Sequence, residues 1–260
     1  MRKATIMDDV FVDASGQPRR VRGVTVNSGS PLLVRLAAQI GWESIWIEME
    51  HGPSGFEKVE SLCTAADAGG MVPLVRLPDG ERHHVLRALE AGARIILVPM
   101  VDDAAYARKI VEYGKYPPAG ARGFNTRTPG MGFGLMDPVE AMAQANERTH
   151  LFAQIETTTA VEQVDDILAV EGLSGIFIGP GDLSVNLGVT GQMADPRLRD
   201  MVLSCISKAK AAGKLTGIFT VPGPLLSGAM EAGCNLVVCG GDVINLAKAW
   251  TQLLTEIPEQ

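Results

Sequence analysis

Apolar residues along the chain are grouped in short continuous runs, and the segments between the runs carry apolar residues at helical spacing. Short runs that are apolar at nearly every position are typical of parallel strands covered on both faces. Eight such runs occur, at residues 22–27, 44–49, 72–77, 94–99, 151–156, 175–180, 215–219 and 236–240. The pattern therefore predicts eight strands that alternate with helices.

The segment from Asp79 to Gly92 is an example of a predicted helix. Asp79 can cap its start, Val85, Leu86 and Leu89 share one face, and Gly92 can take the left-handed position at its end. The same ending, a glycine just before a strand, recurs in "QIGW", "DAGG", "AAGK" and "EAGC". Eight such units in about 250 residues fit a closed (β/α)₈ TIM barrel of the α/β class better than an open doubly wound sheet. No GxGxxG follows any predicted strand, which weakens a dinucleotide-binding interpretation.

We predict one barrel domain over residues 21–260, preceded by an N-terminal extension over residues 1–20. One segment, "YPPAGARGFNTRTPGMGFGLM" at residues 116–136, is rich in glycine and proline and does not fit the regular alternation. Long loops in compact domains are usually functional or mobile. Because the segment follows the fourth predicted strand, we expect an active-site loop over the barrel mouth; the alternative is a surface excursion with no role.

Composition narrows the function classes. The 260 residues are 46% hydrophobic and 20% charged, as in a globular protein with a full core. The net charge of −7, without clustered Lys or Arg, argues against nucleic-acid binding. No apolar run approaches the roughly 20 residues of a membrane-spanning helix, and the first residues lack the apolar core of a signal peptide. We therefore expect no membrane partner and a cytoplasmic location.

The four cysteines do not suggest a disulfide framework. They are Cys63, Cys205, Cys234 and Cys239, and no two of them form a CxxC pair. We expect free thiols that are mostly buried.

Polar residues gather where the predicted strands end, which is where barrels of this type build their sites. They are Glu48, Glu50 and His51 after the second strand, Arg76 at the third, Gln154 and Glu156 at the fifth, and Gly181 and Asp182 after the sixth. Because side chains alternate along a strand, Glu48 and Glu50 point to one face, and so do Gln154 and Glu156. Each pair can therefore point inward.

Glu156 and Asp182 suggest a metal site. Two carboxylates from neighbouring strands are too few for a full cage, but they suit a hard cation such as Mg²⁺ or Mn²⁺ that keeps waters or takes substrate oxygens. For either residue alone, a capped turn or a salt bridge is the alternative. A structural zinc site is not expected, because no thiolate and only one histidine are near.

His51 and Arg76 are the other candidates for chemistry. His51, next to Glu50 and a metal, could act as a general base, although a lone histidine beside a turn is more often structural. Arg76 ends an apolar strand and needs an anionic partner, which a substrate oxyanion could be. His83 and His84 fall inside a predicted helix and are expected at the surface.

Six stretches of the chain resemble, in order, the motifs of the HpcH/HpaI aldolases, the class II pyruvate-dependent aldolases. They are "WIEMEHGP", "PLVRLP", "EAGARIILVPMV", "YPPAGARGF", "FAQIET" and "IFIGPGDLS". The resemblance covers roughly residues 20 to 250. The last two stretches, which carry Glu156 and Asp182, are specific as a set.

The resemblance implies a TIM-barrel enzyme that reversibly cleaves a 4-hydroxy-2-oxo acid into pyruvate and an aldehyde. It implies a divalent cation (Mg²⁺, Mn²⁺ or Co²⁺) rather than a Schiff-base lysine, and no lysine lies at a predicted strand end. Carried over by residue, the resemblance makes Glu156 and Asp182 the metal ligands and Arg76 the group that stabilises the enolate oxygen. It makes His51 the base, acting through a metal-bound water, and Gln154 a residue that orients the site. The backbone N–H groups of Gly181 and Asp182 would bind the pyruvate carboxylate.

The chain departs from the family pattern at two acids. Glu48 and Glu90 stand where the family usually has aspartate, and the acid at position 90 is expected to pair with His51. Glutamate is one methylene longer than aspartate. Because a shift of about 1 Å in a catalytic contact can cost about a hundredfold in rate, the pairing of His51 with Glu90 is in question. The loop after "ARG" also differs, so no aldehyde is carried over.

Other functions remain open. Relatives that decarboxylate oxaloacetate or act on CoA thioesters are alternatives within the family, although a CoA site would need a basic patch that the sequence lacks. A barrel that only binds a small oxo acid is the alternative outside catalysis; the set Arg76, Glu156 and Asp182 argues against it.

The resemblance also implies a homo-oligomer, commonly a hexamer. The predicted helix at residues 243–257 would pack on a neighbour through Leu246, Trp250, Leu253 and Leu254. A monomer would need the same apolar stripe to cover its own barrel.

Overall fold

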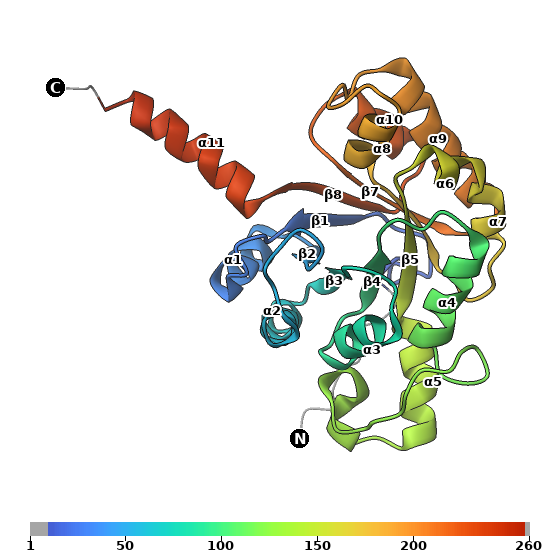
Figure 1. Ribbon diagram of the computed structural model, residues 1–260. Coiled ribbons are helices and arrows are strands. Elements are labelled where there is room, and N and C mark those ends of the chain that lie inside the picture. Colours follow the sequence, from blue (N-terminus) through green and yellow to red (C-terminus); the bar gives the residue numbers. More distant parts are fainter. Residues whose placement is uncertain (1–9, 258–260) are drawn as a thin grey trace.

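A closed barrel of eight parallel strands forms the centre of the protein (Figure 1). The computed structural model describes residues 10–257. Each strand pairs with the next, and β8 pairs with β1. The strands are β1 (Val21–Thr25), β2 (Ser44–Glu48), β3 (Val72–Arg76), β4 (Ile95–Val98), β5 (His150–Ile155), β6 (Gly175–Ile178), β7 (Leu215–Thr220) and β8 (Leu236–Gly241). All eight predicted strands are present, and the predicted TIM barrel is confirmed.

Helices surround the barrel. They are α1 (Pro31–Ile40), α2 (Phe56–Ala68), α3 (Arg82–Glu90), α4 (Ala104–Gly114), the 3₁₀ helix η1 (Pro129–Gly134), α5 (Pro138–Arg148), α6 (Thr158–Glu162), α7 (Val164–Leu168), α8 (Pro180–Asn186), α9 (Pro196–Ala211), α10 (Pro224–Glu231) and α11 (Asp242–Thr255). Gly92, at φ 104°, takes the left-handed position predicted after α3. Asp79 is not the cap of α3, because the helix begins later and Asp79 accepts the N–H of Glu81 instead.

The core has two layers, which alternate along each strand. In β2, Ile45 and Ile47 face the surrounding helices, whereas Trp46 faces the barrel interior. Phe11, from the segment before β1, enters the interior and meets the ring of His150 edge-on at 4.9 Å. Each fully buried side chain of this size stabilises the fold by about 1.5–3 kcal/mol. The filled interior leaves room for a site only where the strands end.

The C-terminal helix α11 leaves the barrel instead of covering it (Figure 1). None of its residues is buried. Trp250, Leu253 and Leu254 are 65%, 56% and 70% exposed, respectively, so the predicted apolar stripe faces solvent in the single chain. Leu32, Leu36 and Ile40 of α1 are also exposed. This chain alone therefore leaves two apolar surfaces uncovered.

The segment 116–136 does not lie over the barrel mouth, and that prediction is corrected. Helix α4 runs between β4 and this segment and carries the chain back to the amino ends of the strands. There the side chain of Lys115 donates to the carbonyl of Thr149 at 2.6 Å, and η1 packs so closely on α3 that a Cβ on Gly130 would lie 2.1 Å from the carbonyl oxygen of Leu89. The segment therefore follows a helix and not a strand, which places it at the amino ends of the strands.

The four cysteines are free thiols, as predicted. Cys63, Cys205 and Cys234 are buried, Cys239 is partly buried, and all four are free. Among residues 10–257, no helix is long and apolar enough to cross a membrane.

Candidate active site

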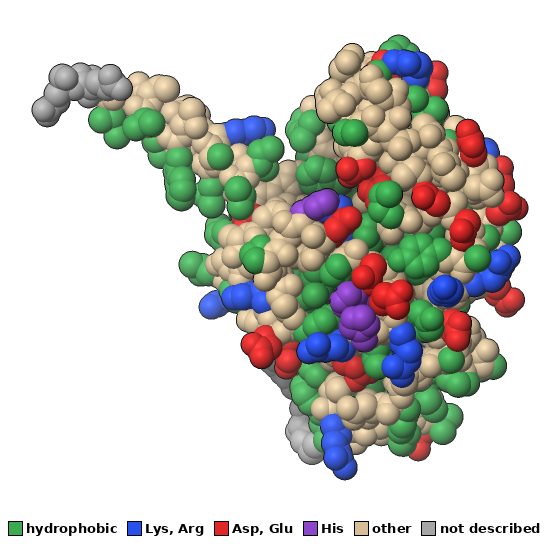
Figure 2. Space-filling model, in the orientation of Figure 1, with side chains coloured by type: hydrophobic (Ala, Val, Ile, Leu, Met, Phe, Trp, Pro, Cys, Tyr) green, Lys and Arg blue, Asp and Glu red, His purple; other side chains and the backbone are tan. Residues whose placement is uncertain are grey.

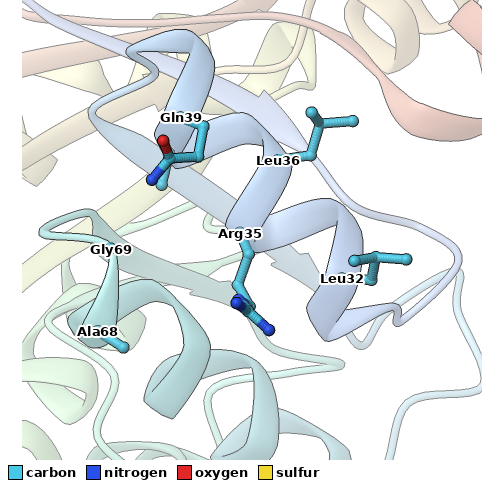
Figure 3. A pocket seen from close by; sticks show the side chains of 7 residues that line it. Leu32, Arg35, Leu36, Gln39, Ala68 and Gly69 are labelled. Carbon is cyan, nitrogen blue, oxygen red and sulfur yellow. The ribbon is translucent and has the colours of Figure 1, made fainter.

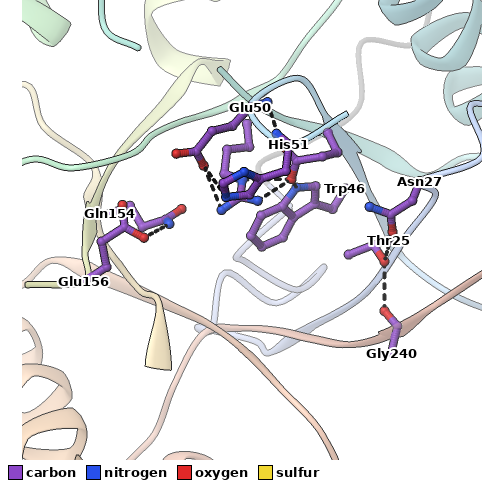
Figure 4. A network of polar contacts seen from close by, with 10 residues as sticks. Thr25, Asn27, Trp46, Glu50, His51, Gln154, Glu156 and Gly240 are labelled. Atoms are coloured by element: carbon purple, nitrogen blue, oxygen red, sulfur yellow. Dashed lines mark hydrogen bonds and ion pairs between the residues drawn. The ribbon is translucent and has the colours of Figure 1, made fainter. Parts of the chain in front are cut away.

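A cavity of about 270 Å³ lies at the carboxyl ends of the strands. The predicted site residues that line it are Glu48, His51, Arg76, Gln154, Gly181 and Asp182. Figure 4 shows polar contacts among residues at this cavity and next to it, with Trp46, His51 and Gln154 labelled. A larger hollow of about 610 Å³ lies on the outside of α1 and α2, but it has an apolar lining around one arginine and one glutamine (Figure 3). The chemistry-bearing groups are therefore at the barrel mouth.

The carboxylate of Glu48 is buried and fully engaged. Its Oε2 accepts hydrogen bonds from Nε of Arg76 (2.8 Å) and Nε1 of Trp46 (3.0 Å), and Nη2 of Arg76 lies 2.6 Å away. Its Oε1 accepts the backbone N–H groups of Glu50 (2.6 Å) and His51 (3.1 Å). A buried charge is tolerated only when it is paired and hydrogen-bonded, and both conditions hold here.

Arg76 has a pair of carboxylates as its anionic partner. Its Nη1 lies 3.0 Å from Oε2 of Glu50, and its other two nitrogens face Glu48. The guanidinium also lies over the ring of Trp46, 4.9 Å from the centroid. A guanidinium has five N–H groups, so these three contacts leave two of them for a ligand.

His51 is at the rim of the cavity. Its side chain is 66% exposed, and Nε2 lies 3.7 Å from Oε2 of Glu50. Partial burial raises the pKa of Glu50, although Arg76 and His51 act in the opposite sense. Glu50 is therefore the carboxylate that stands beside the histidine in this chain.

Glu156 is the most buried carboxylate of the site, with 2% of its surface exposed. Its Oε1 accepts the N–H of Met100 at 2.7 Å, and its Oε2 accepts a hydrogen bond from the side-chain amide of Gln154. Met100 takes a left-handed conformation, φ 53°, which costs a non-glycine residue about 1–3 kcal/mol. Burial raises the pKa of Glu156, and the charges of Glu50 and Asp182 add to this against the two hydrogen bonds.

Asp182 lies in the first turn of α8, directly after Gly181. Both residues are exposed to the cavity side of the helix start. The N–H groups in the first turn of a helix have no acceptor within that helix. They are therefore suited to bind an anion next to the two carboxylates.

The sequence of this chain matches a known family over most of its length. The model of the HpcH/HpaI aldolase/citrate lyase family matches residues 22–249. The chain belongs to this family. This HpcH/HpaI member is 34% identical over 228 residues to 2-keto-3-deoxy-L-rhamnonate aldolase of Salmonella gallinarum (87% of this chain, 85% of the relative).

Two solved structures give the same result. The HpcH/HpaI aldolase from Desulfitobacterium hafniense DCB-2 superposes with a TM-score of 0.87 at 32% identity, covering 93% of this chain and 94% of the other. A family protein from Burkholderia cenocepacia J2315 gives 0.84 at 30% identity, covering 92% and 94%. The comparisons confirm the resemblance to the family and, with it, the prediction of a carbon–carbon lyase of the aldolase type.

The donor set fits a divalent cation. Asp182 is near enough to Glu156 for its charge to help raise the pKa of Glu156, an unfavourable arrangement that a cation would relieve. Oε1 of Gln154 is buried and accepts no hydrogen bond within the described residues. Residues 10–257 contain no group of three His, Cys, Asp or Glu side chains placed to hold an ion by themselves. Water or substrate oxygens would have to complete the shell, as they commonly do for Mg²⁺.

Glu90 is not at the site, so its predicted pairing with His51 is not formed within this chain. It ends α3, and residues 91–94 lead from there to the amino end of β4, opposite the cavity. Its Oε1 accepts a hydrogen bond from Nη2 of the buried Arg122 at 3.0 Å. The pairing of Glu90 with His51 was implied only by the family resemblance. A sequence motif does not show whether a residue lies at the mouth or at the base of the barrel.

The structure also brings in residues that sequence reasoning missed. Trp46, Phe177 and Phe219 form an aromatic wall of the cavity, and Thr25 and Asn27 line it from the β1 side. Trp46 was detectable, because it lies two positions before Glu48 and so faces the same side of β2. The others carry no comparable signal, since each stands alone among apolar or turn residues.

Gly179 allows a test of Glu156 as the predicted metal ligand. A Cβ here would lie 3.0 Å from Oε2 of Glu156 and 3.3 Å from Nε2 of Gln154, while the backbone (φ −102°) accepts any residue. We expect Gly179→Ala to displace the carboxylate and to raise the metal concentration for half-maximal activity about tenfold. Gly55→Ala, whose Cβ meets open space, is the control. An unchanged metal requirement in a metal titration of activity would contradict the role of Glu156.

Proposed function

We propose that this family member reversibly cleaves a 4-hydroxy-2-oxo acid into pyruvate and an aldehyde through the enolate of pyruvate. The observation that carries the proposal is the cavity that Asp182 and Arg76 line together, beside the carboxylate of Glu156, which is hydrogen-bonded to the lining residue Gln154 and feels the charge of Asp182. The name of the Salmonella gallinarum relative, 2-keto-3-deoxy-L-rhamnonate aldolase, supports a 2-oxo acid as the substrate.

The reaction needs charge stabilisation at one oxygen. Breaking the C3–C4 bond leaves negative charge on the oxygen at C2. A divalent cation held by Glu156 and Asp182 would supply Lewis-acid chemistry at that position. Arg76 would direct its two remaining N–H groups at the same oxygen, and because Glu48 and Glu50 already fix the guanidinium, little reorganisation is needed when the charge forms.

The reaction also needs a base. The proton of the 4-hydroxyl must be removed while the C3–C4 bond breaks, and C3 of the enolate must then be protonated to give pyruvate. His51 is the candidate for the first transfer, since its imidazole stands at the cavity rim beside Glu50. The N–H groups of Gly181 and Asp182 would bind the carboxylate of the oxo acid.

Exchange of the pyruvate methyl protons tests the proposal. In D₂O with Mg²⁺, Mn²⁺ or Co²⁺, an enzyme that forms the enolate replaces the methyl protons by deuterium, which ¹H NMR follows directly. We expect exchange that stops when EDTA is added. Absence of exchange with all three metals would reject the aldolase and favour a barrel that only binds an oxo acid.

Decarboxylation of oxaloacetate is a second candidate, because it reaches the same enolate by loss of CO₂. The position of His51 favours it, since this side chain is 66% exposed at the cavity rim and decarboxylation needs no base at a 4-hydroxyl. Pyruvate release from oxaloacetate, compared with cleavage of 4-hydroxy-2-oxo acids at equal concentration, distinguishes the two.

We further propose a homo-oligomer in which α11 packs on another copy. Figure 2 shows hydrophobic side chains gathered along this helix, and the hollow beside Leu32 and Leu36 of α1 offers an apolar counterpart (Figure 3). A second copy is the occupant that the chain itself supplies, because the helix carries apolar residues that its own barrel does not bury. A hexamer remains the expectation from the family resemblance.

Charges on this helix are expected to break the assembly. The double variant Trp250→Glu and Leu254→Glu places two carboxylates where an apolar contact is proposed, so sedimentation velocity should show a smaller species. Gln252→Glu, on the opposite side of the helix, adds charge without touching the stripe and should sediment as the wild type does. Equal sedimentation of all three proteins would reject α11 as the contact.

A further inference from the structure

Trp46 contacts the site although it carries no group that the reaction requires. It is 4% exposed and points into the barrel from the middle of β2. Its Nε1–H donates to Oε2 of Glu48 at 3.0 Å, and the same oxygen accepts from Nε of Arg76 and lies 2.6 Å from Nη2 of Arg76. Its ring lies against the guanidinium, 4.9 Å from centroid to Cζ. One side chain thus touches both members of the Glu48–Arg76 pair.

The indole is itself held in place from across the barrel. Phe177 of β6 meets its ring edge-on at 5.1 Å, and Phe219 of β7 does so at 5.9 Å. Edge-to-face contacts of this kind favour one ring orientation. Trp46 is therefore a fixed reference point, whereas the longer side chains of Glu48 and Arg76 have several rotatable bonds each.

We propose that Trp46 is a positioning residue for Arg76 and acts through Glu48. The indole N–H fixes the direction of Oε2, Oε2 fixes Nε and Nη2, and the ring face limits tilting of the guanidinium. The two N–H groups left over then point at one place in the cavity. This inference rests on the proposed function, in which Arg76 meets the enolate oxygen, and adds the group that determines where the guanidinium lies.

The geometry also accounts for glutamate at position 48. Its carboxylate reaches the indole, the guanidinium and two backbone N–H groups at once. An aspartate would draw the carboxylate back by about 1.5 Å, the length of one C–C bond. It could then keep the backbone contacts only by giving up the indole or the guanidinium.

Two substitutions separate the hydrogen bond from the ring. Trp46→Phe removes the N–H and keeps an aromatic ring; Trp46→Leu removes both. We expect kcat for cleavage of the oxo acid to fall about tenfold in Trp46→Phe and further in Trp46→Leu, with KM within about twofold of the wild type. Trp42→Phe, outside the barrel interior, is the matched control and should leave both constants unchanged.

Coupling to Glu48 distinguishes positioning from general loosening of the core. If Trp46 acts through Glu48, Trp46→Phe has almost no further effect on kcat once Glu48→Gln is present. Additive effects in the double variant would overturn the proposal.

A chemical readout tests the position of Arg76 without any assay of activity. Phenylglyoxal reacts with accessible guanidinium groups, and the side chain of Arg76 is only 11% exposed. Mass spectrometry should find faster modification of Arg76 in Trp46→Phe than in the wild type, with Arg22 reacting equally in both. If the wild-type protein shows no cleavage or exchange, the proposed function fails and this measurement still decides the role of Trp46. Unchanged reactivity of Arg76 together with unchanged kcat would overturn the inference.

Discussion

Replacing Glu156 with alanine is expected to lower metal-dependent cleavage about 10³-fold in kcat/KM. The proposal gives the ion two carboxylates among residues 10–257, Glu156 and Asp182, so the loss of one removes half of its charged protein ligands. The measurement is cleavage of a 4-hydroxy-2-oxo acid and exchange of pyruvate methyl protons, each over a range of Mg²⁺, Mn²⁺ and Co²⁺ concentrations. Calorimetric titration of the same metals gives the affinity directly.

Loss of folding would not explain that result. Because burial raises the pKa of Glu156, the fold disfavours its ionised form, and stability falls as the pH rises through the raised pKa. A neutral side chain removes this penalty. Glu156→Gln keeps the shape of the side chain and an acceptor for the N–H of Met100. Its stability against unfolding should therefore be at least that of the metal-free wild type. Glu162→Ala, on the exposed side of α6, is the control for activity. Full activity of Glu156→Ala would show that the metal site is elsewhere.

The barrel could be predicted because each of its strands is a short apolar run that can be recognised from neighbouring residues alone. Eight apolar runs separated by helical segments leave few alternatives. The two-residue period of β2 puts Glu48 on the same face as Trp46, and in the structure this face is turned to the barrel interior. The carboxyl ends of parallel strands then meet at one rim, which brings Arg76 and Gln154 together. In the structure Glu48, Arg76 and Gln154 line one cavity, as this argument predicts.

Residues on connections were placed less well, for a physical reason. A segment lies at the mouth of the barrel if it follows a strand and at the base if it follows a helix. Residues 116–136 were expected at the mouth because they follow β4 along the chain, but α4 comes between and places them at the base. Glu90 was assigned from resemblance to a motif, and its position at the end of α3 separates it from His51. The pairing of Glu90 with Arg122 joins two segments whose contact no local pattern reveals.

Arg76→Lys is expected to lower kcat about 10²-fold or more while the protein stays folded. Lysine keeps the charge that Glu48 requires, so no buried carboxylate is left without a cation. It has one nitrogen, however, and cannot contact Glu48 twice, reach Glu50 and still donate to the substrate. Arg22→Lys, at an exposed pair with Glu43, is the matched control.

The two assays together identify the oxygen on which Arg76 acts. Exchange of the pyruvate methyl protons forms the enolate without any aldehyde, whereas cleavage of the oxo acid also involves the aldehyde half. If Arg76 stabilises the enolate oxygen, exchange and cleavage fall by similar factors in Arg76→Lys, because both pass through the same charged species. If exchange keeps its wild-type rate and only cleavage falls, Arg76 acts on the aldehyde half of the substrate, and the guanidinium that Glu48 and Trp46 hold in place serves substrate selection rather than enolate formation.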